Sequence, residues 1–323
     1  MKGKIHVLGI DIAKAKFDVC LLLFSGTKRE RSFANNIDGI AELLHWLKEQ
    51  CGEACQIGIE ATGCYWILLA SQLHAAGYVV YLLNPAYVKA HIQSNGRRSK
   101  TDRIDAQWIA DYVCTHDCER WEPLTAEVEE LRELMRLYAD MTAINVRVKQ
   151  RKESIRTEAV QRLHEEIALS VKTLTHKVLQ AAKDHVKRHA GLKQKVKCLK
   201  SVKGIGAITA LIFVAELPAG RSARKVSAWA GVTPRHHESG QTVYKRPRLS
   251  KQGNDYVRHS LYWPAITAIR FNPAMQSFAA RLRAAGLNKM QVIGAAMHKL
   301  LRWAVGIMNS NTCFDPTRHL NVS

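Results

Sequence analysis

The chain has 323 residues, of which 47% are hydrophobic, which is enough for about two domain cores and excludes an intrinsically disordered protein. Its 48 Lys and Arg against 28 Asp and Glu give a formal net charge of +20, which favours nucleic acid as a partner ahead of an anionic membrane. No apolar run reaches the roughly 18 residues of a transmembrane helix, and the apolar stretch near the N-terminus is too short for a secretory signal. We therefore expect a cytoplasmic protein that spans no membrane, and eight cysteines with no C-x-x-C pair fit a reducing compartment.

The first third of the chain predicts an α/β domain. We expect strands over residues 5–10, 16–24 and 28–34, a helix over 37–50, a strand over 56–59, a helix over 64–76, a strand over 78–83 and a helix from about Thr101. Three hairpin-like strands ahead of α/β alternation are typical of a ribonuclease-H-like domain, whereas a plain doubly wound sheet does not begin this way.

The middle of the chain predicts a long helical coiled-coil arm. Apolar residues step by threes and fours over 128–148 and again over 163–178, which indicates two amphipathic helices that form an antiparallel pair. The charged segment between them, Lys149–Glu158, is either a bend or a continuous solvated helix. We interpret this region as a spacer or a dimerisation arm.

The last third predicts a mainly helical domain. We expect helices over 207–217, 224–231, 255–269 and 289–308, and a loop rich in basic and turn residues over 233–253. The fold class is therefore α/β plus α, with domains over 1–122, 123–198 and 199–323.

Four acidic residues form the first candidate site. Asp11 and Glu60 each end a predicted strand, and Asp102 and Asp105 lie three apart at the start of a helix. Singly, each has an ordinary explanation, such as a favourable charge at a helix start. Together they would repel unless they held divalent cations, and carboxylate oxygens suit Mg²⁺ or Mn²⁺ in a two-metal phosphodiester site.

A Gly-x-Gly turn forms the second candidate site. Lys203, Gly204 and Gly206 precede the apolar helix over 207–217, as in helix-hairpin-helix DNA modules, where backbone N–H groups meet a phosphate. Lysines at 193, 195, 197 and 200 add attraction for a phosphate backbone. The turn by itself is equally a tight connection between helices.

The third candidate is a serine in the basic loop. Ser239 precedes a glycine, and cations that surround an attacking hydroxyl would stabilise the charge that develops on a phosphodiester. From the residues alone an ordinary Ser-Gly turn beside a DNA-contacting loop is the better interpretation. The candidate nucleic-acid contacts around the serine are Arg235, Lys245, Arg246, Arg248 and Lys251.

These motifs, in this order, resemble a known family. The segments Gly9–Lys14, Glu60–Gly63, Asn84-Pro85 and Lys100–Ala106 are similar to the DEDD transposases, a family that includes a pilin-gene-inverting recombinase and bridge-RNA-guided recombinases. Gly204–Gly206, Trp229–Arg235 and Glu238–Gly240 resemble the transposase domain of the same family. The resemblance covers nearly the whole chain, apart from about the last 20 residues.

The resemblance implies more than the spacing does. Asp11, Glu60, Asp102 and Asp105 would be the metal-binding tetrad of a Holliday-junction-resolvase-like domain, and Ser239 would form a covalent phosphoserine link to DNA. It also implies donor and target DNA, a structured noncoding bridge RNA, a homodimer that assembles into a tetramer on DNA, and a location at the bacterial nucleoid.

Three other functions remain open from the sequence. A structure-selective nuclease would use the tetrad alone and leave hydrolysed ends with no protein–DNA adduct. A noncatalytic nucleic-acid-binding regulator would keep its function after carboxylate substitutions. A sugar-kinase-like ATPase is suggested by Asp11 followed by Lys14, although the net charge and the helical arm argue against it.

Overall fold

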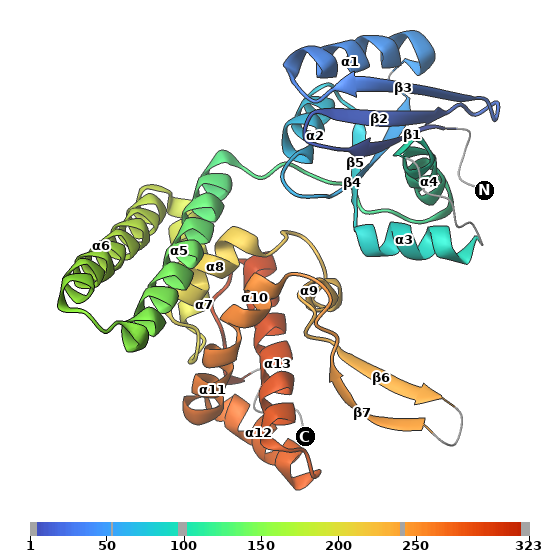
Figure 1. The fold of residues 1–323 in the computed structure, drawn as a ribbon. Coiled ribbons are helices and arrows are strands. Elements are labelled where there is room, and N and C mark those ends of the chain that lie inside the picture. The colour runs from blue at the N-terminus through green and yellow to red at the C-terminus, as the bar shows by residue number, and fades with distance from the viewer. Residues whose placement is uncertain (1–4, 53, 96–101, 240–242, 318–323) are drawn as a thin grey trace. The chain divides into compact units, whose positions relative to one another are not determined.

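The computed structural model describes residues 5–52, 54–95, 102–239 and 243–317, with the side chains of 102–104 and 235–248 outside that description. The chain forms two compact units, Met1–Leu124 and Thr125–Ser323, and each is described by itself (Figure 1). The helical arm that we expected as a separate domain is grouped with the C-terminal residues in the second unit.

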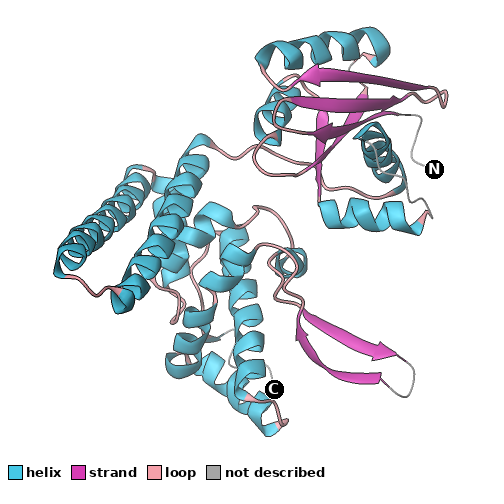
Figure 2. Ribbon diagram, in the orientation of Figure 1, coloured by secondary structure: helices cyan, strands magenta, loops and turns pink. Residues whose placement is uncertain are grey.

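The first unit is a mixed α/β structure around a five-stranded sheet (Figure 2). The sheet order is β3-β2-β1-β4-β5, in which β1, β2 and β3 run antiparallel while β4 and β5 run parallel to β1. The sequence predicted five strands in this part of the chain, with bounds that differ from the observed ones by at most two residues. The strands are β1 (His6–Ile12), β2 (Lys16–Leu22), β3 (Lys28–Ala34), β4 (Cys55–Glu60) and β5 (Val79–Leu83).

The helices of the first unit are α1 (Ile37–Cys51), α2 (Trp66–Ala75), α3 (Pro85–Ser94) and α4 (Asp102–Thr115). The sequence did not predict α3. Asn84-Pro85 ended the preceding strand in our interpretation, but Asn84 is the N-cap, its side chain accepts from the amide of Ala86, and Pro85 occupies the first turn. Both residues are favoured at helix starts.

Two glycines allow α4 to lie directly on the sheet. A Cβ at Gly9 on β1 would lie 2.1 Å from the backbone oxygen of Ala106, and a Cβ at Gly58 on β4 would lie 2.6 Å from Val113. Only a residue without a side chain permits such a close approach of helix and strand. Val7 packs with Ala110 and Val113, so α4 runs antiparallel to β1 and its N-terminus lies at the end of β1 that carries Asp11.

The second unit begins with a pair of long helices, α5 (Ala126–Arg151) and α6 (Glu158–Arg188). A short 3₁₀ turn, Lys152–Ser154, joins them, so the charged segment is a bend. The base of the pair is part of the main core of the unit, where Leu131 and Met135 from α5 meet Ala182 and Val186 from α6. The helical pair and the C-terminal helices therefore share one core.

The rest of the second unit is mostly helical, with α7 (Ala190–Lys200), α8 (Ala207–Glu216), α9 (Ala223–Trp229), α10 (Asp255–Ser260), α11 (Tyr262–Phe271), α12 (Pro273–Ala284) and α13 (Lys289–Ser310). Our helix over 255–269 is broken at Leu261, and α12 was not predicted. Asn272 caps α12 by accepting from the amides of Ala274 and Met275, with Pro273 in the first turn.

The segment predicted as a basic loop is instead a β-hairpin. Strand β6 (Pro234–Ser239) pairs antiparallel with β7 (Val243–Leu249), and Figure 2 shows the two strands as the β-structure of this unit. Cationic residues interrupt the alternation of β-forming residues in β7, so the sequence did not predict a strand there. Pro247 has no N–H to donate to a neighbouring strand, which disfavours a position inside a sheet. Both strands of a two-stranded ribbon are edge strands, however, where a missing N–H is tolerated.

Among the residues that the structure describes, no helix is both long enough and apolar enough to cross a membrane.

Candidate active site and nucleic-acid surfaces

The register of the sheet brings two predicted acids to neighbouring strand ends. Ile10 on β1 is paired with Ile59 on β4, so the next residues of these parallel strands, Asp11 and Glu60, stand side by side. Gly9 and Gly58 face α4, and residues two apart on a strand share a face, so Asp11 and Glu60 project toward α4.

The third acid follows from the position of α4. Asp105 directly precedes Ala106, the residue whose backbone oxygen meets Gly9, and it lies in the first turn of α4 near the Asp11 end of β1. Asp102 begins the same helix, but its side chain lies outside the described residues. Backbone placement thus gathers Asp11, Glu60 and Asp105 at one end of the sheet under one helix terminus.

The donor set at this end of the sheet fits a hard divalent cation. All the candidate ligands are carboxylates, the oxygen donors that Mg²⁺ and Mn²⁺ prefer. Among the side chains that are described, which do not include Asp102, no three His, Cys, Asp or Glu come close enough together to hold a metal ion.

A further acid lies on the same face of the sheet. Asp18 on β2 is directly opposite Asp11 in the antiparallel register and is only 5% exposed. The sequence did not predict a role for Asp18 because this residue lies inside a predicted strand and not at a strand end. A β1–β2 hairpin with its turn directly after Ile12 puts Asp18 opposite Asp11, so the hairpin register is the signal that would have identified Asp18.

The hairpin places Ser239 at its tip. Ser239 is the last residue of β6 and pairs with Val243, the first residue of β7, so the chain reverses directly after the serine. In the backbone register Arg235 pairs with Arg248 and His237 with Lys245, which sets the cationic residues along the same ribbon. The side chains of these residues lie outside the described set, so their contacts remain predictions.

The segments that flank the hairpin are fastened to α9 and α10. The guanidinium of Arg258 donates to the carbonyl of Ala230 at 3.1 Å, and the amide of Lys251 donates to the carbonyl of Gly231 at 3.1 Å. Gly253 is needed there because a Cβ would lie 2.0 Å from the carbonyl oxygen of Trp229. Lys251 itself adopts a φ of +56°, an uncommon conformation for a residue with a side chain.

The two glycines of the Gly-x-Gly turn have different surroundings. Gly204 has a φ of +117°, and a Cβ there would lie 2.6 Å from the Cβ of Ala268 on α11, so this glycine is needed for helix packing. The side-chain amide of Asn272 donates to the carbonyl of Lys203 at 3.3 Å, which fastens the turn to the start of α12. Gly206 has open space around it and is the N-cap of α8, the position from which backbone N–H groups can meet a phosphate.

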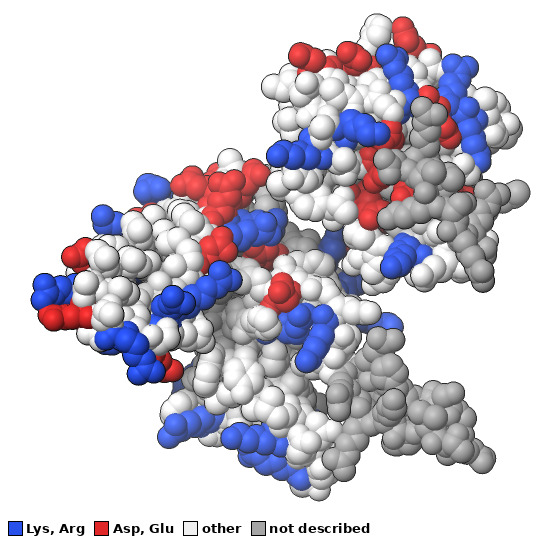
Figure 3. All heavy atoms as spheres, in the orientation of Figure 1, with Lys and Arg blue, Asp and Glu red and all other residues white. Residues whose placement is uncertain are grey.

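Charge is unevenly distributed along the second unit. Between residues 190 and 314 the sequence has 20 Lys and Arg but three Asp and Glu, and residues 256–314 contain no acid. In Figure 3 the visible face of the part with α11 to α13 accordingly shows Lys and Arg without Asp or Glu. This bias favours contact with a phosphate backbone.

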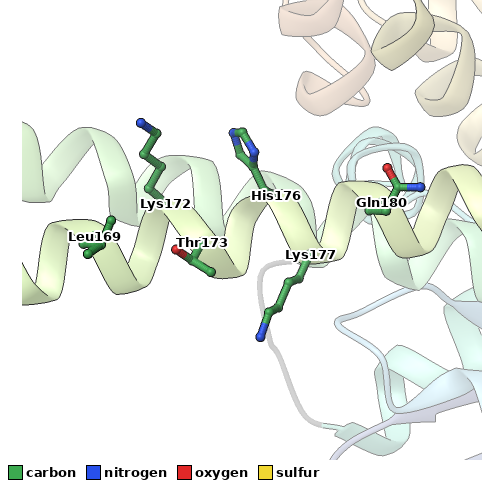
Figure 4. A pocket seen from close by; sticks show the side chains of 6 residues that line it. All are labelled: Leu169, Lys172, Thr173, His176, Lys177 and Gln180. Carbon is green, nitrogen blue, oxygen red and sulfur yellow. The ribbon is translucent and has the colours of Figure 1, made fainter.

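Two surface hollows lie outside the candidate sites, because none of the candidate site residues lines them. One, of about 470 Å³, is lined by residues of α6 alone, Leu169, Lys172, Thr173, His176, Lys177 and Gln180 (Figure 4). The other, of about 530 Å³, lies beside an ion pair between Arg136 on α5 and the buried Glu216 on α8. Hydrogen bonding to Glu216 raises the pKa of Arg136, and burial raises the pKa of the neighbouring Tyr256 phenol.

Comparison with known proteins gives the family. Residues 8–160 match a transposase model of the DEDD, IS110 type, and residues 196–280 match the model of the transposase IS116/IS110/IS902 family. The pilin gene-inverting proteins of Moraxella lacunata and Moraxella bovis are each 29% identical to this chain, over 97% of it and 98% of their own length. The transposase for insertion sequence element IS1111A of Coxiella burnetii is 25% identical over 82% of this chain and 78% of its own. The first model spans the strands that carry Asp11 and Glu60 and the second spans the hairpin with Ser239, and the chain therefore belongs to the IS110 group of DEDD transposases, a family of DNA-processing enzymes.

Proposed function

We propose that this transposase cuts and rejoins DNA strands of a mobile insertion sequence through a covalent phosphoserine intermediate at Ser239, with Asp11, Glu60, Asp102 and Asp105 binding Mg²⁺ or Mn²⁺. The observation that carries the proposal is the register of Ile10 with Ile59, which puts Asp11 beside Glu60 at neighbouring strand ends near the N-terminus of α4. Family membership adds the reaction class.

We also interpret the two units in terms of function. The sheet order with three antiparallel strands ahead of two parallel ones supports a ribonuclease-H-like, Holliday-junction-resolvase-like domain in the first unit. The α5–α6 pair supports a coiled-coil arm, and the α7–turn–α8 segment supports a helix-hairpin-helix-like element. These assignments remain proposals, as does the division into domains at 1–122, 123–198 and 199–323.

The serine step conserves the energy of the phosphodiester. Ser239 Oγ would attack the scissile phosphorus, so that the Oγ–P bond forms as the bond from phosphorus to the 3′ oxygen breaks. The serine loses its proton, the departing 3′ oxygen gains one, and the 5′ phosphate stays on the protein. Attack by a 3′ hydroxyl of another strand reverses these changes and releases the serine, so rejoining needs no ATP.

The residues around the serine and the acids have separate tasks in this proposal. A bound divalent cation would stabilise negative charge on the phosphate oxygens. The four carboxylates would hold and orient that ion, while Arg235, Lys245, Arg246, Arg248 and Lys251 would bind the DNA backbone on both sides of the cut. Lys203, Gly204 and Gly206 would give a further backbone contact, with Gly206 as the exposed member.

Partners follow from the same assignment. We propose donor and target DNA, a structured noncoding RNA that pairs with both, and a homodimer that becomes a tetramer on DNA. A cytoplasmic location at the nucleoid fits these partners. The strongly basic stretch 190–314 supports a nucleic-acid partner but does not distinguish RNA from DNA.

A direct test is a search for the covalent intermediate. The purified full-length protein is incubated with Mg²⁺ and a plasmid that carries the gene's own locus and its flanking DNA. The reaction is stopped in detergent, the DNA is digested, and peptides are examined for a nucleotide bound to Ser239. Ser239→Ala should bind DNA normally and give neither adduct nor recombinant junction. An adduct on another residue would overturn the serine assignment.

The second candidate is a metal-dependent structure-selective nuclease without a serine nucleophile. It is favoured by the face of the first unit's sheet where Asp11, Glu60 and Asp105 gather, which we call the carboxylate face. The chemistry of this face resembles that of a two-metal phosphodiester site. It predicts hydrolysed 5′ phosphates and full cleavage by Ser239→Ala. The same digestion experiment therefore separates the two candidates.

A further inference from the structure

One charged pair on the carboxylate face has no task in the proposed mechanism. Lys16 and Asp18 both lie on β2, two residues apart, so they share a face of the sheet. The ammonium of Lys16 donates to Asp18 Oδ2 at 2.8 Å. Asp18 lies opposite Asp11, so this face is the one under α4.

The position of Asp18 is costly without a compensating cation. Residues directly opposite in an antiparallel pair have Cβ atoms about 4.5–5.5 Å apart, and like charges there are destabilising. The side chain of Asp18 is 7% exposed, so water screens the repulsion from Asp11 poorly. Lys16 offsets this charge, and the hydroxyl of Ser32 on β3 also donates to Asp18.

The two members of the pair differ in exposure. Asp18 is buried and accepts from Lys16 and Ser32, whereas the Lys16 side chain is 52% exposed. Lys16 lies at the start of β2, beside the end of β1 that carries Asp11, and its half-exposed side chain is in contact with solvent there. An oriented ammonium next to carboxylates is suited to a substrate that carries its own negative charge.

We propose that Lys16 is a phosphate-contacting catalytic residue of the N-terminal site and that Asp18 is the positioning residue that holds its ammonium there. The inference rests on the proposed function, because it takes the DNA phosphodiester as the substrate of the carboxylate face. Lys16 binds a nonbridging oxygen of the scissile phosphate and neutralises charge that grows during bond exchange. Asp18 acts only through Lys16.

The test uses full-length protein in two assays. The first measures the rate of recombinant-junction formation, at several concentrations of the plasmid with the gene's own locus. The second measures the affinity for a labelled four-way DNA junction as a function of salt. The variants are Lys16→Gln, Lys16→Arg, Asp18→Asn and the double variant, with Lys28→Gln as the matched control. Lys28 is an exposed lysine at the opposite end of the same sheet.

We expect Lys16→Gln to lower the maximal rate by about 100- to 1,000-fold, as loss of one charge-stabilising donor does. It should also reduce the slope of log affinity against log salt by about 0.9. Lys16→Arg should restore most of the rate. Asp18→Asn should lower the maximal rate too, and the double variant should be no slower than Lys16→Gln, since the residues act as one unit. Lys28→Gln should behave as the wild type.

Other outcomes overturn the inference. If Lys16→Gln recombines at the wild-type rate while Asp11→Asn is inactive, Lys16 has no catalytic task and the proposed function still stands. If Asp11→Asn is also fully active, the proposed function of the carboxylates fails. If Asp18→Asn lowers only the midpoint of urea unfolding, and Lys16→Gln leaves both the recombination rate and the salt dependence of junction binding intact, the pair is purely structural.

Discussion

The guanidinium of Arg136 on α5 holds the buried carboxylate of Glu216 on α8 at two points, 2.8 Å from Nε to Oε1 and 3.3 Å from Nη2 to Oε2. Arg132 adds a longer ion pair to the same carboxylate at 3.8 Å. The pair fixes the base of the helical arm to the core of the second unit. A buried carboxylate that loses its main partner is strongly destabilising.

Arg136→Met should therefore lower the free energy of unfolding by about 2–4 kcal/mol, less than for a fully enclosed pair because Arg132 remains and Arg136 is partly in solvent. Urea denaturation followed by circular dichroism measures this. Arg147→Met is the matched control, an exposed arginine further along α5, and should change stability by less than about 0.5 kcal/mol. Equal effects of the two substitutions would contradict a special role for the Glu216 pair.

The Gly-x-Gly turn gives a second prediction within one motif. Gly204→Ala places a methyl group against Ala268 and strains a φ of +117°, so it should destabilise the second unit by about 2–4 kcal/mol. Gly206→Ala has open space and a φ of −80°, so stability should change by less than about 1 kcal/mol. Thermal unfolding of the two variants is the measurement, and a Gly206 variant that is the less stable of the two would refute this packing.

How far the sequence predicts the fold depends on what each pattern encodes. The five strands were predictable because nearly all of their buried residues are apolar and because acidic residues such as Asp11 and Glu60 lie at or near strand ends. Helix α3 was missed because Asn84-Pro85 suits a helix start as well as a turn. The β6–β7 hairpin was missed because its alternation is interrupted by cations and Pro247, and no local signal distinguishes that from a basic loop.

The candidate site was predictable to a similar degree. Strand-end acids could be assigned from the sequence, since parallel strands end at one edge of a sheet. Asp18 could not, because its proximity to Asp11 depends on the hairpin register and not on any pattern around Asp18 itself. The packing role of Gly204 likewise depends on α11, which lies about 60 residues further along the chain.

The carboxylate face predicts a strict need for a divalent cation. Asp11→Asn and Asp102→Asn should each abolish junction formation while the far-ultraviolet circular dichroism spectrum stays that of the wild type, since each removes a charged oxygen ligand. Excess EDTA should stop the wild-type reaction, and Mg²⁺ or Mn²⁺ should restore it. Glu42→Gln, an exposed acid on α1, is the control and should remain active. Full activity in EDTA would exclude metal-dependent chemistry.

The cationic residues predict steeply salt-dependent binding. If Lys245, Arg246 and Arg248 each neutralise one phosphate, the triple change to Gln should reduce the log–log salt slope of DNA binding by about 0.7–0.9 per phosphate contact. Fluorescence anisotropy with a labelled four-way DNA junction measures the slope between low and moderate salt. Lys48→Gln on α1 is a single-charge control in the first unit, outside the hairpin sequence. A triple variant with an unchanged slope would remove these residues from the interface.

The last prediction concerns the helical arm as a contact between protomers. On α6, His164 and Thr175 are buried against α5, whereas Val160, Leu163, Ile167 and Leu174 are between 49% and 60% exposed. Their spacing of three, four and seven residues forms one stripe along the helix, the pattern of a coiled-coil seam, and the stripe stays exposed within the part of the chain that the structure describes. The proposed homodimer would cover this stripe.

Leu163→Glu combined with Ile167→Glu should therefore convert a dimer to a monomer in light scattering and abolish recombination, because carboxylates in an apolar seam lack partners. The fold should survive, since the core contacts of Leu131, Met135 and Ala182 lie at the other end of the arm. Gln161→Glu with Lys172→Glu adds acids to exposed polar positions of the same helix and should leave the dimer intact. If the apolar pair of substitutions leaves mass and recombination unchanged, the stripe has another partner and the arm is only a spacer.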